Sequence, residues 1–391
     1  LGVIIDTAGQ WAWLSFVMAG MIALISAHSY SRLSVKYRDS GGAYTFLQKM
    51  GQKNLAAGLA WVLIIGYILT VSVYAFTFGH YVAYVFSAGA WLPRILAFVS
   101  IAFLALINLR GVHESSTLEI ITVWGKLFVL LGLSLFGILQ WKPELLTAGI
   151  EVKPVHTAIV GAATIFMAYE GFQLLSYDYH DIRNPQKTLP RAIISAVIAV
   201  TVIYILVTIG ASMLVGANTL IAQKEVALSA AGKKALGTTG LVLVTIAAAF
   251  STGSAINATL FSTARLMEHV AAKNDLPAVL KKRNRSGIPY YAILIIAAMA
   301  AVLSVIGSLS TLVDAASLIF LITFGVVNLV AWLEKVRYRL LCLAGATGCL
   351  LAIILSVYEQ AKQKPVPLII TIAFLAAATV LQPFVRNAKK K

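Results

Sequence analysis

The sequence predicts an all-α protein that crosses a membrane many times within one domain, residues 1–391. Of its 391 residues, 60% are hydrophobic and only 12% are charged, which is too little polar surface for a soluble domain of this length. Apolar runs of about 18 residues or more, long enough to span a bilayer as a helix, recur along the whole chain. These two observations predict a polytopic membrane protein with eleven spans in these residues.

Most of the 15 acidic residues lie in the polar connections between the predicted spans. Two ionisable residues, Lys126 and Glu170, fall instead deep inside apolar runs. The predicted spans are 11–30, 55–86, 92–109, 117–140, 156–178, 191–216, 236–264, 289–309, 311–333, 338–357 and 367–385.

Basic residues orient the predicted spans, because Lys and Arg accumulate in short cytoplasmic loops. One set of alternate loops holds 22 of the 31 basic residues and the opposite set holds 8, with Lys126 inside a span. This asymmetry predicts a cytoplasmic C-terminus, and it explains most of the formal charge of +16 as a topology signal rather than a nucleic-acid surface. An odd number of spans leaves residue 1 outside, so we expect a first span to precede Leu1.

Several kinds of chemistry find no support in the sequence. Cys342 and Cys349 lie in one late span and are interpreted as small apolar packing residues. The chain has no Cys/His metal spacing, no phosphate-binding glycine loop and no recognisable set of nucleophile, base and acid. We therefore expect no metal, no cofactor, no nucleic-acid partner and no enzymatic activity.

Lys126 is the most unusual basic residue. In "TVWGKLFVLLGL" it has apolar neighbours on both sides, and it lies too far from the end of its span for easy snorkelling. Ionisable groups at such depth usually mark ion or proton pathways. A lysine that loses its proton in one conformation and regains it in another can carry protons, so Lys126 is a candidate coupling residue. The alternative is a permanent ion pair that only holds helices together.

Two predicted spans contain segments that favour a broken helix. "FMAYEGF" places Glu170 beside Gly171, and "FSTGSAINATLFSTAR" surrounds Gly253 with small and polar residues. Such residues either allow close helix packing or line a wet site. Unwound backbone at membrane depth is tolerated only where it is buried in protein or lines a cavity. Glu170 itself is interpreted as an ion-pair or proton site, or as a group that faces a hydrated cavity or caps a half-helix.

Three segments together resemble the amino acid-polyamine-organocation (APC) transporter superfamily. The family's second span and the loop after it are similar to "WAWLSFVMAGMIALISAHSYSRLSVKYRDSGGAYTFLQ". Its sixth span resembles "FMAYEGFQLLSYDYHDIRNPQKTLPRAI", and its eighth resembles "STGSAINATLFSTARLMEHVAAKNDLP". The resemblance covers essentially the whole chain in the right order. One departure is His180 with Asp181 before "IRNP", where relatives commonly carry adjacent acidic residues.

The resemblance implies a twelve-span fold with a LeuT-type core of two inverted five-helix repeats, followed by two extra helices. Residues 1–140 would supply spans two to five, residues 156–333 the second repeat and residues 338–385 the extra spans. The segment "LGVIIDTAG" resembles the stretch just after the family's first span, which would therefore lie upstream of Leu1.

A substrate site in the sixth span is also implied. In relatives, backbone carbonyls of an unwound segment hold the α-amino group of the substrate. We expect the carbonyls of Met167, Ala168 and Glu170 to do so here, because carbonyls freed from a helix need donors. Phe166, Met167 and Phe172 are candidates for packing or gating. The candidate substrate-binding residues are Phe166, Met167, Ala168, Tyr169, Glu170, Gly171 and Phe172.

Lys126 matches the lysine that occupies the place of a sodium ion in proton-coupled relatives. The matching partners in the eighth span are Ser251, Thr252 and Ser254. A lysine in a cation site disfavours sodium, since two positive charges would compete for the same oxygens. The resemblance thus implies proton coupling, with sodium-independent exchange as the alternative.

The resulting functional prediction is a multi-pass amino acid transporter of the plasma membrane. Its expected partners are a neutral or apolar amino acid, protons and membrane lipid, with anionic lipids contacting the basic loops. Further candidates for lining the pocket are Tyr67, Tyr74, Asn257 and Thr323. An exchanger of amino acids or polyamines and a non-transporting amino acid sensor of the same fold remain alternatives. A channel is disfavoured because no pore segment is repeated.

Overall fold

The computed structural model describes residues 1–86, 89–111, 116–363, 365–373 and 376. Throughout these residues the chain forms helices and short connections, and none of the residues described forms a β-strand. The predicted all-α fold class is confirmed.

The helices have the following bounds. The α-helices are α1 (Gly2–Ala8), α2 (Ala12–Tyr37), α3 (Gly42–Lys49), α4 (Lys53–Phe86), α5 (Leu92–Leu109), α6 (Ser116–Leu139), α7 (Thr157–Thr164), α8 (Pro185–Val215), α9 (Ala217–Ala222), α10 (Ala227–Ala272), α11 (Tyr290–Ile306), α12 (Leu309–Leu333) and α13 (Arg339–Gln363). The 3₁₀ helices are η1 (Gly9–Trp11), η2 (Pro143–Leu146), η3 (Phe166–Tyr169), η4 (Phe172–Asp181), η5 (Lys224–Val226) and η6 (Ala278–Lys281).

These helices coincide with the predicted membrane spans. Within the described ranges, eight helical segments are long and apolar enough to cross a bilayer, and α7 forms a ninth span with the bent segment after it. The shorter apolar helix α11 covers the range expected for another span. The last predicted span, residues 367–385, lies mostly outside the described residues, of which 365–373 are helical. The polytopic membrane architecture is therefore confirmed.

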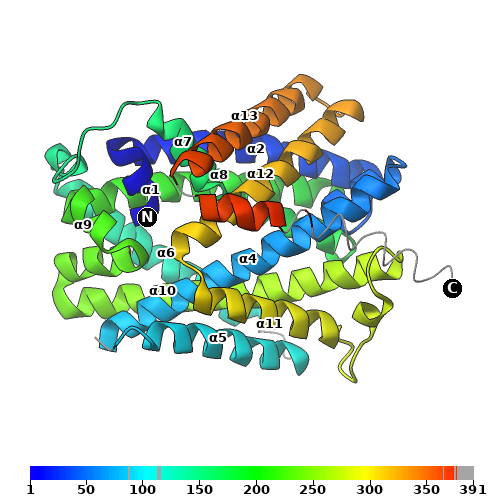
Figure 1. The fold of residues 1–391 in the computed structure, drawn as a ribbon, viewed down its shortest axis with the longest axis horizontal. Helices are drawn as coiled ribbons and strands as arrows, with labels where there is room; N and C mark the ends of the chain where they lie inside the picture. Colours follow the sequence, from blue (N-terminus) through cyan, green and yellow to red (C-terminus); the bar gives the residue numbers. More distant parts are fainter. Residues whose placement is uncertain (87–88, 112–115, 364, 374–375, 377–391) are drawn as a thin grey trace.

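Helix α4 occupies the centre of the bundle. Its most apolar window is 83% buried, and it packs against α5, α10 and α12. Figure 1 shows α4 crossing the molecule between α5 and α11 on one side and α2 and α12 on the other. Side chains of α4 form hydrogen bonds with the bent span, beside which the candidate site lies.

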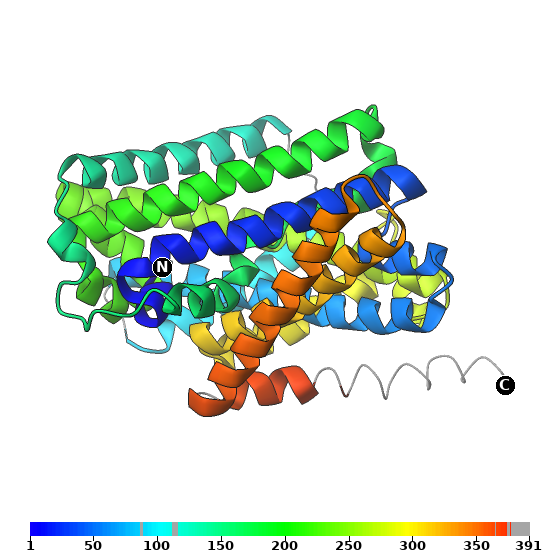
Figure 2. The same ribbon diagram turned by 90° about the horizontal axis from the view of Figure 1, so that it is seen from above.

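Helix α6 lies at the periphery, beside α8. Its most apolar window is only 17% buried, and Figure 2 shows α6, α8 and α2 side by side along one edge of the molecule. Large apolar side chains of α6 point outward, with Trp124 69% and Phe128 82% exposed. An apolar surface of this kind would be a liability in water, and it fits the lipid-facing side of a membrane protein.

Small residues bring α6 and α8 into close contact. A Cβ added at Gly137 would lie 2.0 Å from the carbonyl oxygen of Gly210, so the two backbones touch. Helices in membranes associate through van der Waals packing at such small residues, since burial of apolar surface drives little association in lipid. The contact fixes the position of the peripheral helix that carries Lys126.

Replacing Gly210 by alanine is expected to disturb this contact. The new Cβ would lie 2.5 Å from the Cα of Ser134, and overpacking of this kind typically costs about 1–3 kcal/mol. We expect Gly210→Ala to lower the midpoint of thermal unfolding in detergent. Gly132→Ala is the matched control, because a Cβ there meets nothing within 4 Å. Equal midpoints for the two variants would contradict the packing.

Candidate functional site

The span that contains Glu170 is not a continuous helix. Helix α7 ends at Thr164, η3 follows, and the chain resumes as η4 at Phe172. Between η3 and η4, Glu170 is extended, with φ −63° and ψ 143°, and Gly171 has φ 129°. The two halves of the span are bent by 57°. The broken helix predicted from "FMAYEGF" is confirmed.

Gly171 is required by its backbone conformation. A φ of 129° lies in a region that residues with a Cβ rarely adopt. Crowding is not the reason, because a Cβ at this position would meet no atom within 4 Å. The N–H of Gly171 donates to the Oε1 of Gln173 at 3.0 Å, which satisfies one backbone group released by the break.

Helix α12 supplies partners for the first part of the break. The N–H of Met167 donates to the Oγ of Ser317 at 3.0 Å, and this hydroxyl donates to the carbonyl of Thr164 at 2.6 Å. Ser317 is fully buried. One side chain thus joins two backbone groups on either side of the turn between α7 and η3.

Helix α8 supplies a partner for the second part. The hydroxyl of Tyr204 donates to the carbonyl of Ala168 at 2.7 Å, and the N–H of Glu170 donates to the carbonyl of Met167 at 2.9 Å. Two of the three carbonyls proposed to hold an amine therefore already accept one hydrogen bond each. A carbonyl oxygen has two lone pairs, so each retains room for a second donor.

The Glu170 carboxylate belongs to a buried polar chain. Its Oε2 accepts from the hydroxyl of Tyr74 at 3.4 Å, and its Oε1 accepts from the Nε2 of Gln173 at 3.2 Å. Gln173 also donates to the hydroxyl of Tyr67 at 3.3 Å, and that hydroxyl lies 2.8 Å from the hydroxyl of Tyr177. Among the described residues, no basic side chain forms an ion pair with Glu170. The chain ties the break to α4, which contributes Tyr67 and Tyr74.

A cavity of about 320 Å³ lies between the break and α8. Apolar side chains form most of its wall, and Glu170 is its charged group. The cavity therefore combines backbone of the broken segment, one carboxylate and apolar surface, a combination suited to a small amphipathic molecule. It is lined by Ala168, Tyr169, Glu170, Gly171, Phe172, Leu175, Ala196, Val197, Val200 and Tyr204.

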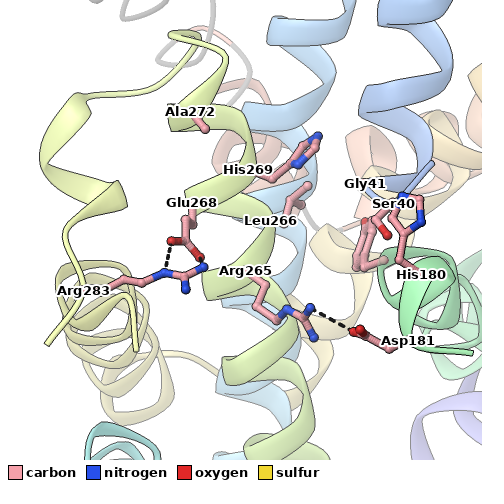
Figure 3. A pocket seen from close by; sticks show the side chains of 11 residues that line it. Ser40, Gly41, His180, Asp181, Arg265, Leu266, Glu268, His269, Ala272 and Arg283 are labelled. Carbon is pink, nitrogen blue, oxygen red and sulfur yellow. Dashed lines mark hydrogen bonds and ion pairs between the residues drawn. The ribbon is translucent and has the colours of Figure 1, made fainter. Parts of the chain in front are cut away.

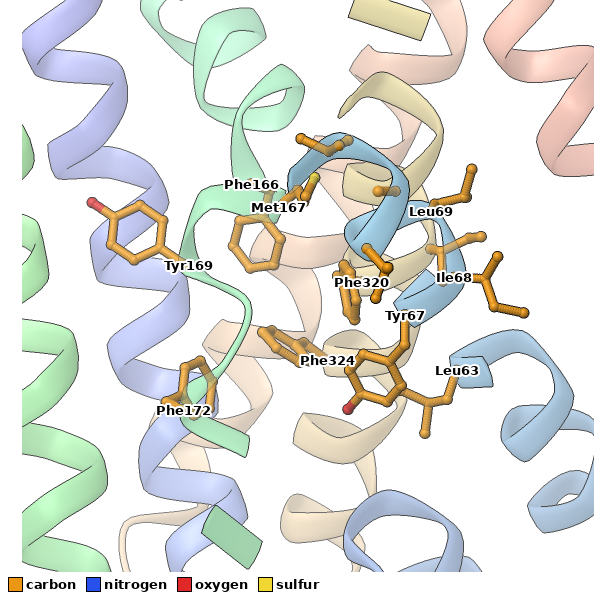
Figure 4. Close-up of a cluster of buried hydrophobic side chains, with 14 of the residues drawn as sticks. Leu63, Tyr67, Ile68, Leu69, Phe166, Met167, Tyr169, Phe172, Phe320 and Phe324 are labelled. Atoms are coloured by element: carbon orange, nitrogen blue, oxygen red, sulfur yellow. The ribbon is translucent and has the colours of Figure 1, made fainter. Parts of the chain in front are cut away.

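Phe166 and Met167, two of the predicted site residues, do not line this cavity. Figure 4 shows Phe166 among buried aromatic side chains, and its ring lies 5.6 Å from that of Phe324 of α12. Phe172 also packs on Phe324, at 5.2 Å between ring centroids. Tyr169 points away from this cluster, and its hydroxyl donates to the carbonyl of Phe16 at 2.6 Å. The geometry of Phe166 matches the predicted packing role.

Lys126 of α6 contacts α10. Its Nζ donates to the Oγ of Ser254 at 3.4 Å, and this hydroxyl donates to the carbonyl of Ser251 at 3.1 Å. Thr252 instead donates to the carbonyl of Ala248, one turn earlier in its own helix. Of the three hydroxyls predicted to face the lysine, Ser254 is the one whose contact is observed. Lys126 itself is half-buried.

The second predicted break, at Gly253, is wrong. Helix α10 departs from helical geometry only at Leu236 and Gly237, and it is continuous through Gly253. A Cβ at Gly253 would meet nothing within 4 Å, so close packing does not require the glycine either. Small and polar composition alone did not distinguish a broken helix from a continuous one.

A second cavity, of about 380 Å³, is lined by Tyr177 and by a cluster of charged side chains. Arg265 of α10 donates to Asp178 at 2.8 Å and to Asp181 at 3.1 Å, which joins α10 to the end of η4. Figure 3 shows the pair with Asp181. Nearby, the Glu268 carboxylate pairs with Arg283 and raises the pKa of that guanidinium. Among the described residues, no group of three His, Cys, Asp or Glu is arranged to hold a metal.

Sequence analysis did not predict the side chains that form hydrogen bonds with the backbone groups at the break. Ser317 and Tyr204 lie in other spans, and their polar groups resemble those of many other membrane residues, so no signal in the chain singles them out. Gln173 was detectable, since it is a polar residue three positions after Glu170 in an apolar run. Of the further pocket candidates, Tyr67 and Tyr74 join the polar chain around Glu170.

The other two pocket candidates bond elsewhere. Asn257 accepts a hydrogen bond from Asn108 of α5 at 2.6 Å, and the hydroxyl of Thr323 donates to the carbonyl of Ile319 in its own helix. Helical phase alone did not indicate which side of each helix faces the site.

Comparison with known proteins identifies the family. A family model described as amino acid permease matches residues 2–391. The chain belongs to the amino acid permease family. The resemblance to APC transporters predicted from the sequence is therefore confirmed, and the broken span of the permease is the feature around which its candidate site is built.

Several transporters are similar to this permease. Inner membrane transport protein YbaT of Escherichia coli is 26% identical over 390 residues, which cover 96% of the permease and 89% of YbaT. Serine/threonine exchanger SteT of Bacillus subtilis is 26% identical over 269 residues, 68% of the permease and 60% of SteT. Human large neutral amino acids transporter small subunit 2 is 27% identical over 297 residues, 71% of the permease and 54% of the relative. The permease thus spans little more than half the length of the last two.

Replacing Gly171 by alanine in the permease is expected to strain the break. Conformations with positive φ typically cost residues with a Cβ about 1–2 kcal/mol, and no neighbouring atom obstructs the new methyl group. We expect Gly171→Ala to lower the midpoint of thermal unfolding and to weaken substrate binding. Gly253→Ala, in the continuous part of α10 with equally open surroundings, is the control. Unchanged binding in Gly171→Ala would show that the site does not depend on this geometry.

Proposed function

We propose that the permease is a secondary active transporter that moves amino acids across the cell membrane by alternating access. The break at Glu170 and Gly171, with the cavity beside it, is the observation that carries this proposal. Discontinuous helices serve transporters in this way, because backbone groups released at the break are available to a substrate near the bilayer midplane.

In this proposal the substrate amine is bound by the carbonyls of Ala168 and Glu170, which line the cavity, and by that of Met167, which does not line it in this arrangement of the helices. An ammonium group carries three donors, and the Met167 and Ala168 carbonyls each have a lone pair left after their contacts within the protein. The Glu170 carboxylate, without a basic partner among the described residues, adds attraction for a cation. The amine of the substrate would be the cation that this carboxylate lacks among the described residues.

Neutral or apolar amino acids are the proposed substrates. Apart from Glu170, the cavity is lined by apolar, small and aromatic residues, which suit an uncharged side chain. The names of two relatives point the same way, since one exchanges serine and threonine and the other transports large neutral amino acids.

Proton coupling through Lys126 is the proposed energy source. The lysine Nζ lies 3.4 Å from the Oγ of Ser254 of α10. This contact supports the role implied by the family resemblance, in which the lysine takes the place of a sodium ion. A lysine that releases its proton in one conformation and takes it up in another can carry protons, and we assign this role to Lys126. Loss of the proton would weaken the contact between α6 and α10 and thereby favour a different arrangement of the two helices.

Alternating access also requires a closure at each end. The Arg265 pairs with Asp178 and Asp181 bridge α10 and η4 at the end of the molecule near the basic loops, and we propose that they close the cytoplasmic path. We further propose that residues 1–140 are the rest of the first of two inverted repeats, spans two to five, and that residues 156–333 are the second repeat. Residues 338–385 are the extra spans in this proposal, and the C-terminus is cytoplasmic.

Uptake by proteoliposomes tests the proposed function. Full-length permease is expected to accumulate radiolabelled neutral amino acids when a pH gradient is imposed, and replacing sodium by choline is expected to leave the rate unchanged. Liposomes without protein are the control. Binding without uptake would favour the sensor alternative, and uptake that requires amino acid preloaded inside would favour the exchanger, as in the name of SteT.

Lys126→Ala tests the coupling role. We expect this variant to lose gradient-driven accumulation while it still exchanges external for internal substrate at equal pH, because exchange requires no net proton transfer. Lys126→Arg is the matched variant, since a guanidinium keeps the charge but does not deprotonate, and we expect it to lose accumulation as well. Accumulation at the wild-type level in Lys126→Ala would refute the assignment.

A further inference from the structure

A third cavity, of about 670 Å³, lies at the end of the molecule opposite the Arg265 cavity. It forms where α4, α6 and α8 end and α10 begins, and its wall includes Tyr84, Gln140, Val215 and Ala230. Because Arg265 lies near the other end of α10, the length of the bundle separates the two cavities. The proposed transport function does not use this third cavity.

Three lysines converge on its wall, namely Lys142 after α6 and Lys233 and Lys234 near the start of α10. All three side chains are exposed, and none forms an ion pair with any described residue. The wall contains no acidic residue: Glu144 and Glu225 are near in sequence but do not line it. The cavity therefore presents positive charge that no described acidic side chain neutralises by an ion pair.

The three cavity lysines are a large share of the basic residues at this end of the molecule. The loops at this end hold 8 of the 31 basic residues, and three of those eight line one cavity. Lysines that share a cavity repel one another, and an anion bound between them offsets this repulsion. The arrangement thus indicates a ligand with negative charge.

The remaining wall indicates what else the ligand contains. Met213, Leu214 and Val215 of α8 form an apolar side, while Gln140 and Thr219 add hydrogen-bonding groups. Immediately before Lys142, Trp141 is 58% exposed. Exposed tryptophans are typical of the membrane–water interface, which puts the cavity at the depth of lipid headgroups.

We propose that this cavity binds a phosphate group, with the three lysines neutralising its charge and the polar wall accepting and donating hydrogen bonds around it. Two sources share this chemistry: the headgroup of an anionic phospholipid, whose chains would lie along the apolar side, and free inorganic phosphate. Lysines near a membrane surface typically contribute roughly fivefold each to the binding of anionic lipid.

The test uses purified full-length permease in neutral detergent and a variant that combines Lys142→Gln, Lys233→Gln and Lys234→Gln. Native mass spectrometry measures the binding of phosphatidylglycerol, with phosphatidylcholine for comparison. A separate arm measures the shift in unfolding midpoint with inorganic phosphate against chloride at equal ionic strength. The control combines Lys273→Gln, Lys281→Gln and Lys282→Gln, which removes the same charge at the other end.

We expect wild type and control to prefer phosphatidylglycerol, and the cavity variant to bind it at least about tenfold more weakly. A phosphate-dependent shift that the cavity variant loses would identify the free anion as a ligand, and its absence would leave the lipid as the source. Where the triple variant is not monodisperse, Lys233→Gln with Lys234→Gln is expected to change binding in the same direction. Wild-type binding by the cavity variant in both arms, or an equal loss in the control, would overturn the proposal.

Discussion

The structure depends on the requirement that backbone polar groups inside a bilayer have partners. A break at Glu170 and Gly171 releases N–H and C=O groups at membrane depth, and the protein satisfies them with Ser317 of α12 and Tyr204 of α8. Because these partners come from different spans, the break is possible only where α8 and α12 pack against it. The same packing creates the cavity beside it. The break and the cavity beside it therefore depend on one set of hydrogen bonds.

Helix α10 connects the parts that the proposed mechanism requires. It carries Ser254, which contacts Lys126, and about three turns later Arg265, which binds Asp178 and Asp181 at the end of the broken span. A change of charge at Lys126 therefore acts on a helix that also holds one end of the broken span. No separate signalling element is needed to relate the two sites, since one continuous helix runs from Thr238, just after the irregular Leu236 and Gly237, to Ala272.

The sequence predicted the features that depend on local chemistry. Apolar run lengths predicted the spans, and Gly171 beside a buried carboxylate predicted the break, because each depends on properties of neighbouring residues. The partners of the break were not predictable: Ser317 and Tyr204 are 150 and 36 residues from the groups they bind, so only the folded chain brings them together. Gly253 illustrates the opposite failure, since its small and polar neighbours suggested a break where α10 is continuous.

The most direct test of the central claim is whether the site recognises an amine. Purified permease with a bound radiolabelled neutral amino acid would be challenged with the same unlabelled amino acid and with the matched 2-hydroxy acid, in which a hydroxyl replaces the ammonium group. The hydroxyl offers one donor in place of three, and charge-assisted hydrogen bonds contribute roughly 1.5–3 kcal/mol each. We predict that the hydroxy acid competes at least about a hundredfold more weakly. Equal competition by the two compounds would contradict binding of the amine by the carbonyls of the broken span.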